Sequence, residues 1–411
     1  MRTLYISYDG MTDTLGQSQV IPYLAGLAAK GHEIQLLSCE KPERFKEVEG
    51  EIRKLLAGFK IGWHPILYHK SPPIFSTLWD LNHLKRVALA LQAQHHFEVV
   101  HCRSYISSLV GIMLKRRFGV RFIFDMRGFW ADERVDGGLW NLSNPAYRLV
   151  YNYFKARERE FLLEADHIVS LTHLARAEML RWDLPDKDKL KIAVIPCCAD
   201  LAHFSREKVS ASQQQALRAT LGLKADDFVV TYLGSIGTWY MLPEMLAFFR
   251  QVLLRKPGAK FLFITPDNPE LVRQGAAHAG VPLDSLVITK AKRSEVPPLL
   301  SVSTLGLFFI KPSYSKMSSS PTKLGELLAM GIPVVMNSKV GDSDWISEKF
   351  NIGEVVTEFN DAEYARVAGR LDAMLTIAPE KIRKAAEDYF SLSGGVTQYL
   401  GIYDGLGVKK I

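Results

Sequence analysis

Short apolar segments alternate with helical segments along most of this chain, and this alternation limits the possible folds more than any other feature. At the N-terminus, residues 4–8 are expected to form a buried strand, residues 18–30 a helix, and residues 33–38 a second strand. A strand, a helix and a strand in this order form a βαβ unit, in which the strands are parallel and the crossover is right-handed. The chain is therefore expected to build parallel sheets covered by helices.

The alternation occurs in two series. Further strands of the first series are expected at 99–102, 121–125, 167–171 and 192–196, and strands of the second at 228–233, 260–265, 285–289, 304–310 and 334–337. The polar stretch 205–215 between them is expected to be a linker. Because 411 residues exceed one typical core, two α/β domains are predicted. Their ligands should lie at the carboxyl ends of the strands.

Composition narrows the class of protein. The net charge of +7 is spread over both halves of the chain without a basic tail, which suits an anionic small substrate or an anionic membrane surface and gives little support to nucleic-acid binding. No apolar run reaches the ~18 residues of a membrane span, and the N-terminus lacks a signal-peptide pattern. The four cysteines lack metal-ligand spacing. A cytoplasmic protein is predicted.

The sequence SSSPTKLGELLAMGIPVV at residues 318–335 is the strongest local motif. A helix is expected to begin here with proline at its first position, and the helix N-terminus, with its unpaired N–H groups, attracts an anion. The residues predicted to hold a phosphate are Ser318, Ser319, Ser320, Pro321, Thr322 and Lys323. Glu326, one turn further on, can accept both hydroxyls of a ribose. The alternative is an ordinary capped helix before a strand.

Four further segments carry a family resemblance. They are TLGQSQ at 14–19, IPCCAD at 195–200, YLG at 232–234, and the closing stretch 385–406. In this order the chain resembles the GT-B glycosyltransferases of family 4, which are retaining and use nucleotide sugars. The resemblance implies two Rossmann-like doubly wound domains facing across a cleft. It divides the chain into an acceptor-side domain at 1–203, a donor domain at 204–384, and a helix at 385–411 that crosses back.

The resemblance also assigns donor-binding residues. Gly16 falls in the family's glycine loop, Gly234 and Ser235 follow the YLG strand, and Lys290 begins the base-binding loop. Two positions depart from the pattern: Ser318 stands where the family usually has a sugar-binding Glu, and the Arg and Lys that usually follow the YLG strand are missing. The closest match is a subgroup with S-P-T-K-x-x-E. Replacement cations are sought among Lys311, Lys316, Lys323 and Arg127.

The predicted catalytic residues are cations rather than a nucleophile. Retaining transfer leaves negative charge on the departing diphosphate, so Arg127, Lys323 and Arg103 are expected to stabilise it or to orient the substrates. Arg127 can instead pair with Asp125 or Asp132, and Arg103 with another carboxylate. The charged residues 132–134 are read as a loop that either holds acceptor hydroxyls or is simply solvated.

No cofactor is expected. The histidines lack H-x-x-x-H spacing, and neither a D-x-D pair nor a phosphate-binding G-x-x-x-x-G-K-S/T loop occurs, so no metal site and no ATP hydrolysis are predicted. The apolar segment 71–79, together with the cations at 53–54, 85–86 and 115–117, either contacts an anionic membrane at the inner face of the plasma membrane or is buried in the first domain.

The predicted function is retaining transfer of a sugar from a UDP- or GDP-sugar to a saccharide or lipid-linked saccharide, in the assembly of bacterial envelope polysaccharide, lipopolysaccharide or capsule. One alternative is a GT-B enzyme that uses a nucleoside monophosphate sugar, or that hydrolyses or epimerises its sugar nucleotide. The other is a scaffold that binds nucleotide without turnover. The base, the donor sugar, the acceptor and the linkage are left open by the sequence.

Overall fold

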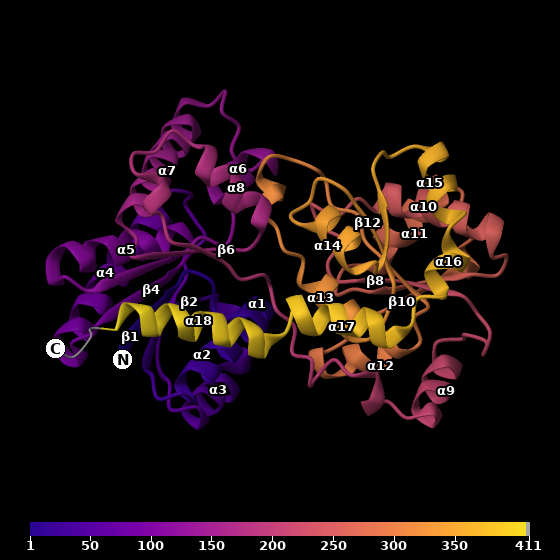
Figure 1. The fold of residues 1–411 in the computed structure, drawn as a ribbon, viewed down its shortest axis with the longest axis horizontal. Helices are drawn as coiled ribbons and strands as arrows, with labels where there is room; N and C mark the ends of the chain where they lie inside the picture. Colours follow the sequence, from indigo (N-terminus) through magenta and orange to yellow (C-terminus); the bar gives the residue numbers. More distant parts are fainter. Residues whose placement is uncertain (408–411) are drawn as a thin grey trace. The chain divides into compact units, whose positions relative to one another are not determined.

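The computed structural model describes residues 1–407, which form two compact units (Figure 1). Unit 1 contains Met1–Pro196 and the segment from Leu392 onward, and unit 2 contains Cys197–Ser391. Each unit is built on one parallel sheet, so the expected architecture of two Rossmann-like doubly wound domains is confirmed. Among the described residues, no helix combines the length and the apolar character that crossing a bilayer requires.

Unit 1 has a seven-stranded sheet in the order β3-β2-β1-β4-β5-β6-β7. Its strands are β1 Arg2–Ser7, β2 Glu33–Glu40, β3 Gly62–Leu67, β4 Val99–Arg103, β5 Arg121–Asp125, β6 His167–Ser170 and β7 Ile192–Val194. Its helices are α1 Thr14–Gln19, α2 Ile21–Ala28, α3 Pro42–Gly58, α4 Phe75–His95, α5 Ser104–Phe118, α6 Trp130–Asp136, α7 Pro145–Glu164, α8 His173–Arg181, a 3-10 turn at Lys187–Lys189, and α18 Leu392–Leu406. The helix α18 lies beside α2, although the two are at opposite ends of the chain (Figure 1).

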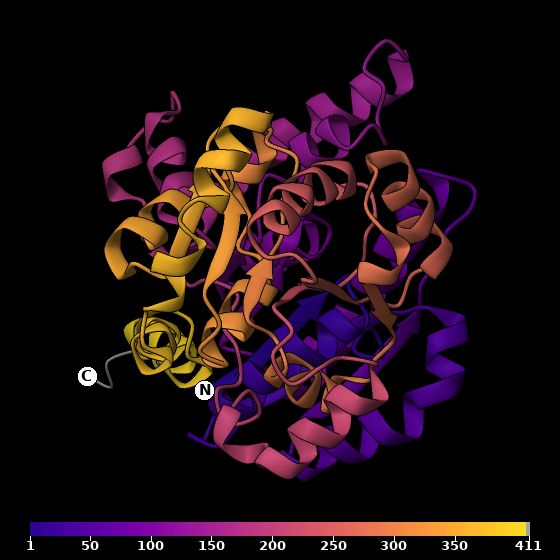
Figure 2. The same cartoon turned by 90° about the vertical axis from the view of Figure 1, so that its right-hand side faces the viewer.

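Unit 2 has a six-stranded sheet in the order β10-β9-β8-β11-β12-β13, with helices on both faces (Figure 2). Its strands are β8 Val229–Leu233, β9 Lys260–Ile264, β10 Leu286–Thr289, β11 Leu305–Leu307, β12 Val334–Asn337 and β13 Gly353–Val356. Its helices are α9 Ala211–Thr220, α10 Leu242–Arg255, α11 Pro269–Ala279, α12 Val296–Ser301, α13 Thr322–Ala329, α14 Ser343–Phe350, α15 Asp361–Ala368, α16 Leu371–Leu375 and α17 Pro379–Tyr389, with 3-10 turns at Arg206–Lys208, Leu283–Ser285, Arg293–Glu295 and Ser315–Ser318.

The strand order reverses once in each sheet, and each reversal marks a place for a ligand. The reversal lies between β1 and β4 in unit 1 and between β8 and β11 in unit 2. On either side of it, the connections leave in opposite directions and open a crevice at the carboxyl ends of the strands. Strand β8, beside the reversal in unit 2, is buried along all five residues, as expected for a parallel strand covered on both faces.

The structure differs from the sequence predictions at several elements. The helix expected at 18–30 is two helices, because Val20 between them has a non-helical φ of −126°. Strand β3 was not predicted because it contains Pro65, and a proline is tolerated there only because β3 lies at the edge of the sheet. The edge strand β13 was also missed. The polar stretch expected as a linker contains α9, whose N-terminus Ser210 and Gln213 cap reciprocally.

The borders between the units also differ from the predicted ones at 203 and 384. Residues 197–203 belong to unit 2, because the backbone N–H of Ala199 donates to the carbonyl of Phe390 (2.7 Å) and Arg383 donates to the carbonyl of Leu201 (3.2 Å). The single helix expected at 385–411 is two: α17 packs on unit 2 and α18 on unit 1, and the chain passes between them at Phe390 and Ser391. Residues 408–411 of that prediction lie outside the described residues.

Candidate functional site

The motif at 318–335 lies in unit 2, at the point where the strand order reverses. Gly234 follows the last residue of β8 and has a φ of +112°, a conformation that strains any residue with a side chain. The first turn of α13 lies next to this glycine, because a Cβ added at Gly234 would stand 3.3 Å from Nζ of Lys323. Because Gly234 has no side chain, it does not fill the space next to Nζ of Lys323.

The start of α13 differs in detail from the prediction. Pro321 precedes the helix instead of occupying its first position, because its ψ of 117° is extended, and no side chain caps the helix N-terminus. The hydroxyl of Ser320 accepts a hydrogen bond from the backbone N–H of Cys197 (3.1 Å), and Ser318 donates to the carbonyl of Ser315 (2.6 Å). Two of the predicted anion-binding hydroxyls thus also hold the loop in shape.

Lys323 carries an unbalanced buried charge. Its residue is 7% exposed, and its Nζ lies 3.6 Å from the ring centre of Tyr240 and 4.1 Å from that of Tyr232. Within residues 1–407, no group forms a hydrogen bond with this nitrogen. Burial lowers the pKa of Lys323 well below its usual range, and the attraction of Glu326 opposes this only in part. Because the aromatic faces do not offset the desolvation of the ammonium, an anion beside Nζ would stabilise it.

Glu326 is also buried and is held by one arginine. The guanidinium of Arg293 donates to its Oε1 at 3.0 Å and also lies over the ring of Phe204, 5.2 Å from its centre. Burial raises the pKa of Glu326, while the charge of Arg293 opposes that rise. A carboxylate can accept several hydrogen bonds. Arg293 therefore orients Glu326 and does not by itself exclude the predicted contact with a ribose.

The other predicted donor-binding residues lie around this centre in unit 2. Ser235 donates to Asp267 (2.8 Å), which also accepts from the backbone N–H of Ile236, so the loops after β8 and β9 are tied together. The Nζ of Lys316 lies 3.7 Å from the ring centre of Trp239. Of the predicted residues not yet described, Ser319 and Thr322 are half-buried, and Lys290 and Lys311 are exposed.

Arg103 and Arg127 lie in unit 1, at the carboxyl ends of β4 and β5, and both are paired with carboxylates. The Nε of Arg103 is 3.1 Å from Asp9, and a guanidinium nitrogen of Arg127 is 3.7 Å from Asp125. Both arginines therefore form the ion pairs that the sequence offered as the alternative to a catalytic role. Arg127 has a φ of +59°, which residues with side chains rarely adopt. Such strain is common at functional sites, so a role for Arg127 in the reaction stays a prediction.

Asp125 lies at the centre of a buried polar cluster. Its Oδ2 accepts from the hydroxyl of Tyr399 (3.1 Å) and is 3.7 Å from Nε2 of His101, whose Nδ1 lies 2.9 Å from the hydroxyl of Tyr403. Burial alone would raise the pKa of Asp125, yet the charge of Arg127 and the nearby imidazole of His101 outweigh it, and the pKa is lowered. Since α18 supplies both tyrosines, this helix completes the cluster.

The charged segment 132–134 is not the loop that the sequence predicted. It lies within α6, and the buried Asp132 accepts hydrogen bonds from Tyr151 (2.8 Å) and Lys155 (2.8 Å) on α7. The prediction was wrong because it relied on charge alone, which suggested a solvated loop. In the structure, Trp130 and the residues that follow it form a helix that packs on α7. Asp132 therefore fixes α6 to α7.

The described residues contain no cluster of three His, Cys, Asp or Glu side chains that could hold a metal ion. The four cysteines, Cys39, Cys102, Cys197 and Cys198, are buried. A metal-independent reaction remains a prediction.

Comparison with known proteins gives the family. A family model described as a glycosyl transferase 4-like domain matches residues 18–198. The computed fold superposes on a glycosyltransferase from Rickettsia africae with a TM-score of 0.73 at 15% identity, over 100% of this chain and 99% of that chain. It superposes on Anabaena HepE in complex with UDP with a TM-score of 0.74 at 14% identity, over 98% and 100% of the two chains. This chain has the GT-B fold, and its residues 18–198 match a glycosyl transferase 4-like domain.

A curated relative agrees with this assignment. The GT-B chain is 27% identical over 263 residues to a D-inositol 3-phosphate glycosyltransferase of Segniliparus rotundus, an alignment that covers 62% of this chain and 54% of that protein. The chain spans about half the length of the curated relatives it matches. At these identities the matched solved structures establish the fold.

Gly16 has a packing role that can be tested. It lies in α1 of unit 1, where a Cβ would stand 2.2 Å from the carbonyl oxygen of Gly10 and 2.7 Å from Cα of Met11. We expect Gly16→Ala to destabilise unit 1 by about 1–3 kcal/mol, because backbone must move to admit the methyl group. Urea unfolding measures the change.

Gly50→Ala is the matched control for that substitution. Gly50 lies inside α3, and a Cβ there meets nothing within 4 Å, so alanine should stabilise the protein by roughly 0.5–1 kcal/mol. Equal stability of the two variants would contradict the packing role of Gly16.

Sequence reasoning missed several residues of the candidate site. Tyr232 and Tyr240 form the aromatic walls around Lys323, and Arg293 pairs with Glu326 across 33 positions of sequence. The tyrosines carried one signal, because both flank the Gly234 turn. The pairing of Arg293 depends on tertiary packing and left no local pattern to find.

Proposed function

We propose that this GT-B glycosyltransferase transfers a sugar, with retention of anomeric configuration, from a UDP- or GDP-sugar to a hydroxyl of a saccharide or lipid-linked saccharide. The proposed setting is the assembly of bacterial envelope polysaccharide, lipopolysaccharide or capsule, on the cytoplasmic side of the membrane. The binding of UDP by the structurally similar Anabaena protein supports a nucleotide donor.

The observation that carries the proposal is the buried ammonium of Lys323 at the first turn of α13. It lacks a hydrogen-bond partner among residues 1–407, it lies beneath Gly234, and the helix N-terminus beside it adds positive potential. A diphosphate beside Lys323 would give the buried ammonium a hydrogen-bond partner and a counter-charge. It would also interact favourably with the positive potential of the helix N-terminus. Glu326, held by Arg293 one turn further along α13, is placed to accept the ribose hydroxyls.

The chemistry proposed for this site is displacement with charge stabilisation. The acceptor oxygen attacks C1 of the sugar from the face that the diphosphate leaves, so the configuration is retained, and the bond between C1 and the phosphate oxygen breaks. The nucleoside diphosphate leaves with the electron pair, and the acceptor proton passes to a phosphate oxygen. Lys323 and the N-terminus of α13 stabilise the negative charge that develops on the leaving group, which is the main catalytic demand. In this scheme these groups serve in place of a metal ion.

A nucleotide panel tests the proposal directly. A ligand that binds the folded protein raises its apparent stability, so UDP or GDP should raise the melting temperature while CMP and ADP should not. Stabilisation by CMP alone would favour the alternative of a nucleoside monophosphate sugar. Stabilisation without any transfer or hydrolysis of the sugar nucleotide would favour a nucleotide-binding scaffold, and no response to any nucleotide would contradict a donor site.

Donor binding should be accompanied by proton uptake. The folded-state pKa of Lys323 is lowered by burial, so the unfolded chain binds more protons and this residue makes stability rise with pH, from the lowered pKa up to the unfolded value of about 10.4. A diphosphate beside Nζ raises that pKa again. We therefore expect UDP binding to take up a proton and to weaken as pH rises, measured by titration calorimetry at about pH 8 in buffers of different ionisation enthalpy.

The control for that measurement is Lys323→Met, which removes the titrating group. It should eliminate the proton uptake while any residual UDP binding continues. Proton uptake of the same size in this variant would show that another group titrates.

A further inference from the structure

Unit 1 contains a cavity that none of the predicted donor-binding residues lines. It has a volume of about 660 Å³ and lies between α4, α5, α6 and α7. This volume is typical of sites that enclose most of a drug-sized molecule. Its walls are mainly aliphatic and aromatic, including Leu81, Ile106, Leu109, Trp140 and Phe154. A cavity of this kind favours an apolar ligand.

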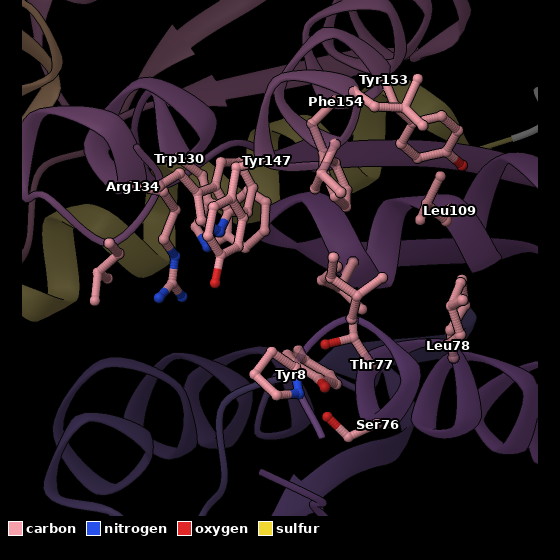
Figure 3. Close-up of a pocket in the computed structure, with 18 of the residues that line it drawn as sticks. Tyr8, Ser76, Thr77, Leu78, Leu109, Trp130, Arg134, Tyr147, Tyr153 and Phe154 are labelled. Carbon is pink, nitrogen blue, oxygen red and sulfur yellow. The ribbon is translucent and has the colours of Figure 1, made fainter. Parts of the chain in front are cut away.

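The two ends of the pocket differ in chemistry. Arg134 and Tyr147 lie at one end with Trp130, and Leu78, Leu109 and Tyr153 lie at the other (Figure 3). The guanidinium of Arg134 lies over the ring of Trp130, 5.0 Å from its centre, and within residues 1–407 no carboxylate forms an ion pair with it. Because α6 follows β5, the Arg134 end is on the side of the sheet where the strands end.

Tyr8 and Lys70 add to the polar character of the lining. Tyr8 follows β1 directly and donates from its hydroxyl to Asp80 (3.0 Å), so its position is fixed. Lys70 follows β3, lines the same pocket and is exposed. Two cations and a row of hydroxyls therefore accompany an apolar chamber. An amphiphile with an anionic head group has this distribution of charge and apolar surface.

The mouth of the pocket exposes large apolar side chains. Leu78 is 56% exposed and Leu149 is 73% exposed, and both line the pocket. Phe75 and Trp79, beside Leu78 on α4, are 72% and 67% exposed. The burial alternative for segment 71–79 is therefore wrong for these side chains. Apolar residues gathered around a pocket mouth mark an interaction surface, and here they extend the apolar character of the pocket outward.

The sequence suggested that the basic cluster at 115–117 contacts the membrane. In the structure, two of its side chains are already paired with carboxylates. Lys115 pairs with Asp166 at 2.9 Å, and Arg116 pairs with Glu160 at 2.7 Å. These ion pairs lie along α5 and α7 and hold the helices together. The cations that line the pocket are Lys70 and Arg134.

We propose that this pocket binds an amphiphilic acceptor from the membrane, with its apolar chain in the chamber and its anionic head group at Arg134 and Lys70. This proposal rests on the proposed function, since it names the acceptor class for the same sugar transfer. The hydroxyl that receives the sugar belongs to the head group of the amphiphile, and the bonds formed and broken are those given above. The apolar rim formed by Phe75, Leu78, Trp79 and Leu149 contacts the lipid surface from which the acceptor enters.

Dodecyl phosphate, a single-chain anionic amphiphile, serves as the probe. We expect the full chain to bind it below its micelle concentration, with quenching or enhancement of tryptophan fluorescence from Trp130 and Trp140 and a calorimetric stoichiometry near one. Leu149→Gln should weaken binding about tenfold, because apolar contact worth about 1.4 kcal/mol is lost at the mouth. Arg134→Gln should weaken dodecyl phosphate binding but leave the binding of uncharged dodecyl maltoside almost unchanged.

Leu163→Gln is the matched control, since Leu163 is 43% exposed on the same helix α7 but does not line the pocket. This control should bind dodecyl phosphate like the parent chain. Binding weakened equally by Leu163→Gln and Leu149→Gln would mean adsorption on apolar surface in general and would overturn the proposal. No binding by the parent chain would overturn it as well.

The proposed function and this proposal can fail separately. If UDP stabilises the chain and dodecyl phosphate does not bind, the pocket proposal is overturned and the donor site stands. If dodecyl phosphate binds as expected and no nucleotide does, the pocket remains an amphiphile site but its role as an acceptor site is overturned. Binding of both, with Leu149→Gln leaving the UDP response intact, supports both.

Discussion

Lys323→Met should lower the rate of the proposed sugar transfer by about 10²–10³-fold, the usual cost of removing one group that stabilises charge in a transition state. The same substitution should stabilise the free protein by about 1–4 kcal/mol, because methionine fills the space between Tyr232 and Tyr240 without burying a charge. UDP should then raise the melting temperature much less than in the parent. Steady-state kinetics and thermal unfolding with and without UDP measure these effects.

Lys349→Met is the control for that experiment. Lys349 also lies over an aromatic ring, 4.5 Å from the centre of Trp345, but it is exposed on α14. Its substitution should change neither turnover nor the response to UDP. A Lys323→Met protein that loses stability and keeps its turnover would show that the ammonium has a structural role.

Asp125→Asn should destabilise unit 1 by about 3–5 kcal/mol, because it breaks a buried ion pair with Arg127 and removes the carboxylate at the centre of the buried polar cluster. The lowered pKa of Asp125 has a related consequence. Its contribution is fully present above the unfolded pKa of about 3.9 and is lost as pH falls through the lower folded value. Denaturant unfolding, followed by hydrogen exchange of the β4 and β5 amides, isolates unit 1 from unit 2.

Two substitutions calibrate this result. Tyr399→Phe removes one hydrogen bond to Asp125 and should cost about 1 kcal/mol. Asp186→Asn breaks an exposed ion pair with Lys189 (2.9 Å) and should cost no more than ~1 kcal/mol. Should Asp125→Asn cost no more than Asp186→Asn, the buried cluster would not be a stabilising unit.

The fold could be predicted from the sequence wherever the hydrophobic pattern of a segment matches the burial of its residues in the structure. The strand at 121–125 was found to the residue, because the centre of a buried parallel strand is a continuous apolar run. Strand β3 was hidden by Pro65, which only an edge position tolerates. The border after Pro196 was hidden as well, because the bond between Ala199 and Phe390 joins residues far apart in sequence.

The site was predictable where its chemistry is local. Lys323 and Glu326 lie on adjacent turns of one helix, so their spacing alone indicated a shared site. The partner of Glu326, the aromatic walls around Lys323 and the pocket in unit 1 come from several elements each. The pocket gave no sequence pattern because its lining residues are spread from Tyr8 to Phe154.

The position of α18 sets an order of events during synthesis of the chain. Unit 1 needs Tyr399 and Tyr403 to complete the cluster at Asp125, and Val396 packs against Gly26 of α2. At translation rates of about 5–20 residues per second, the ribosome spends on the order of ten seconds or more on unit 2 before it reaches this helix. The N-terminal part must therefore wait on the ribosome, incomplete, while the second unit is made and can already fold.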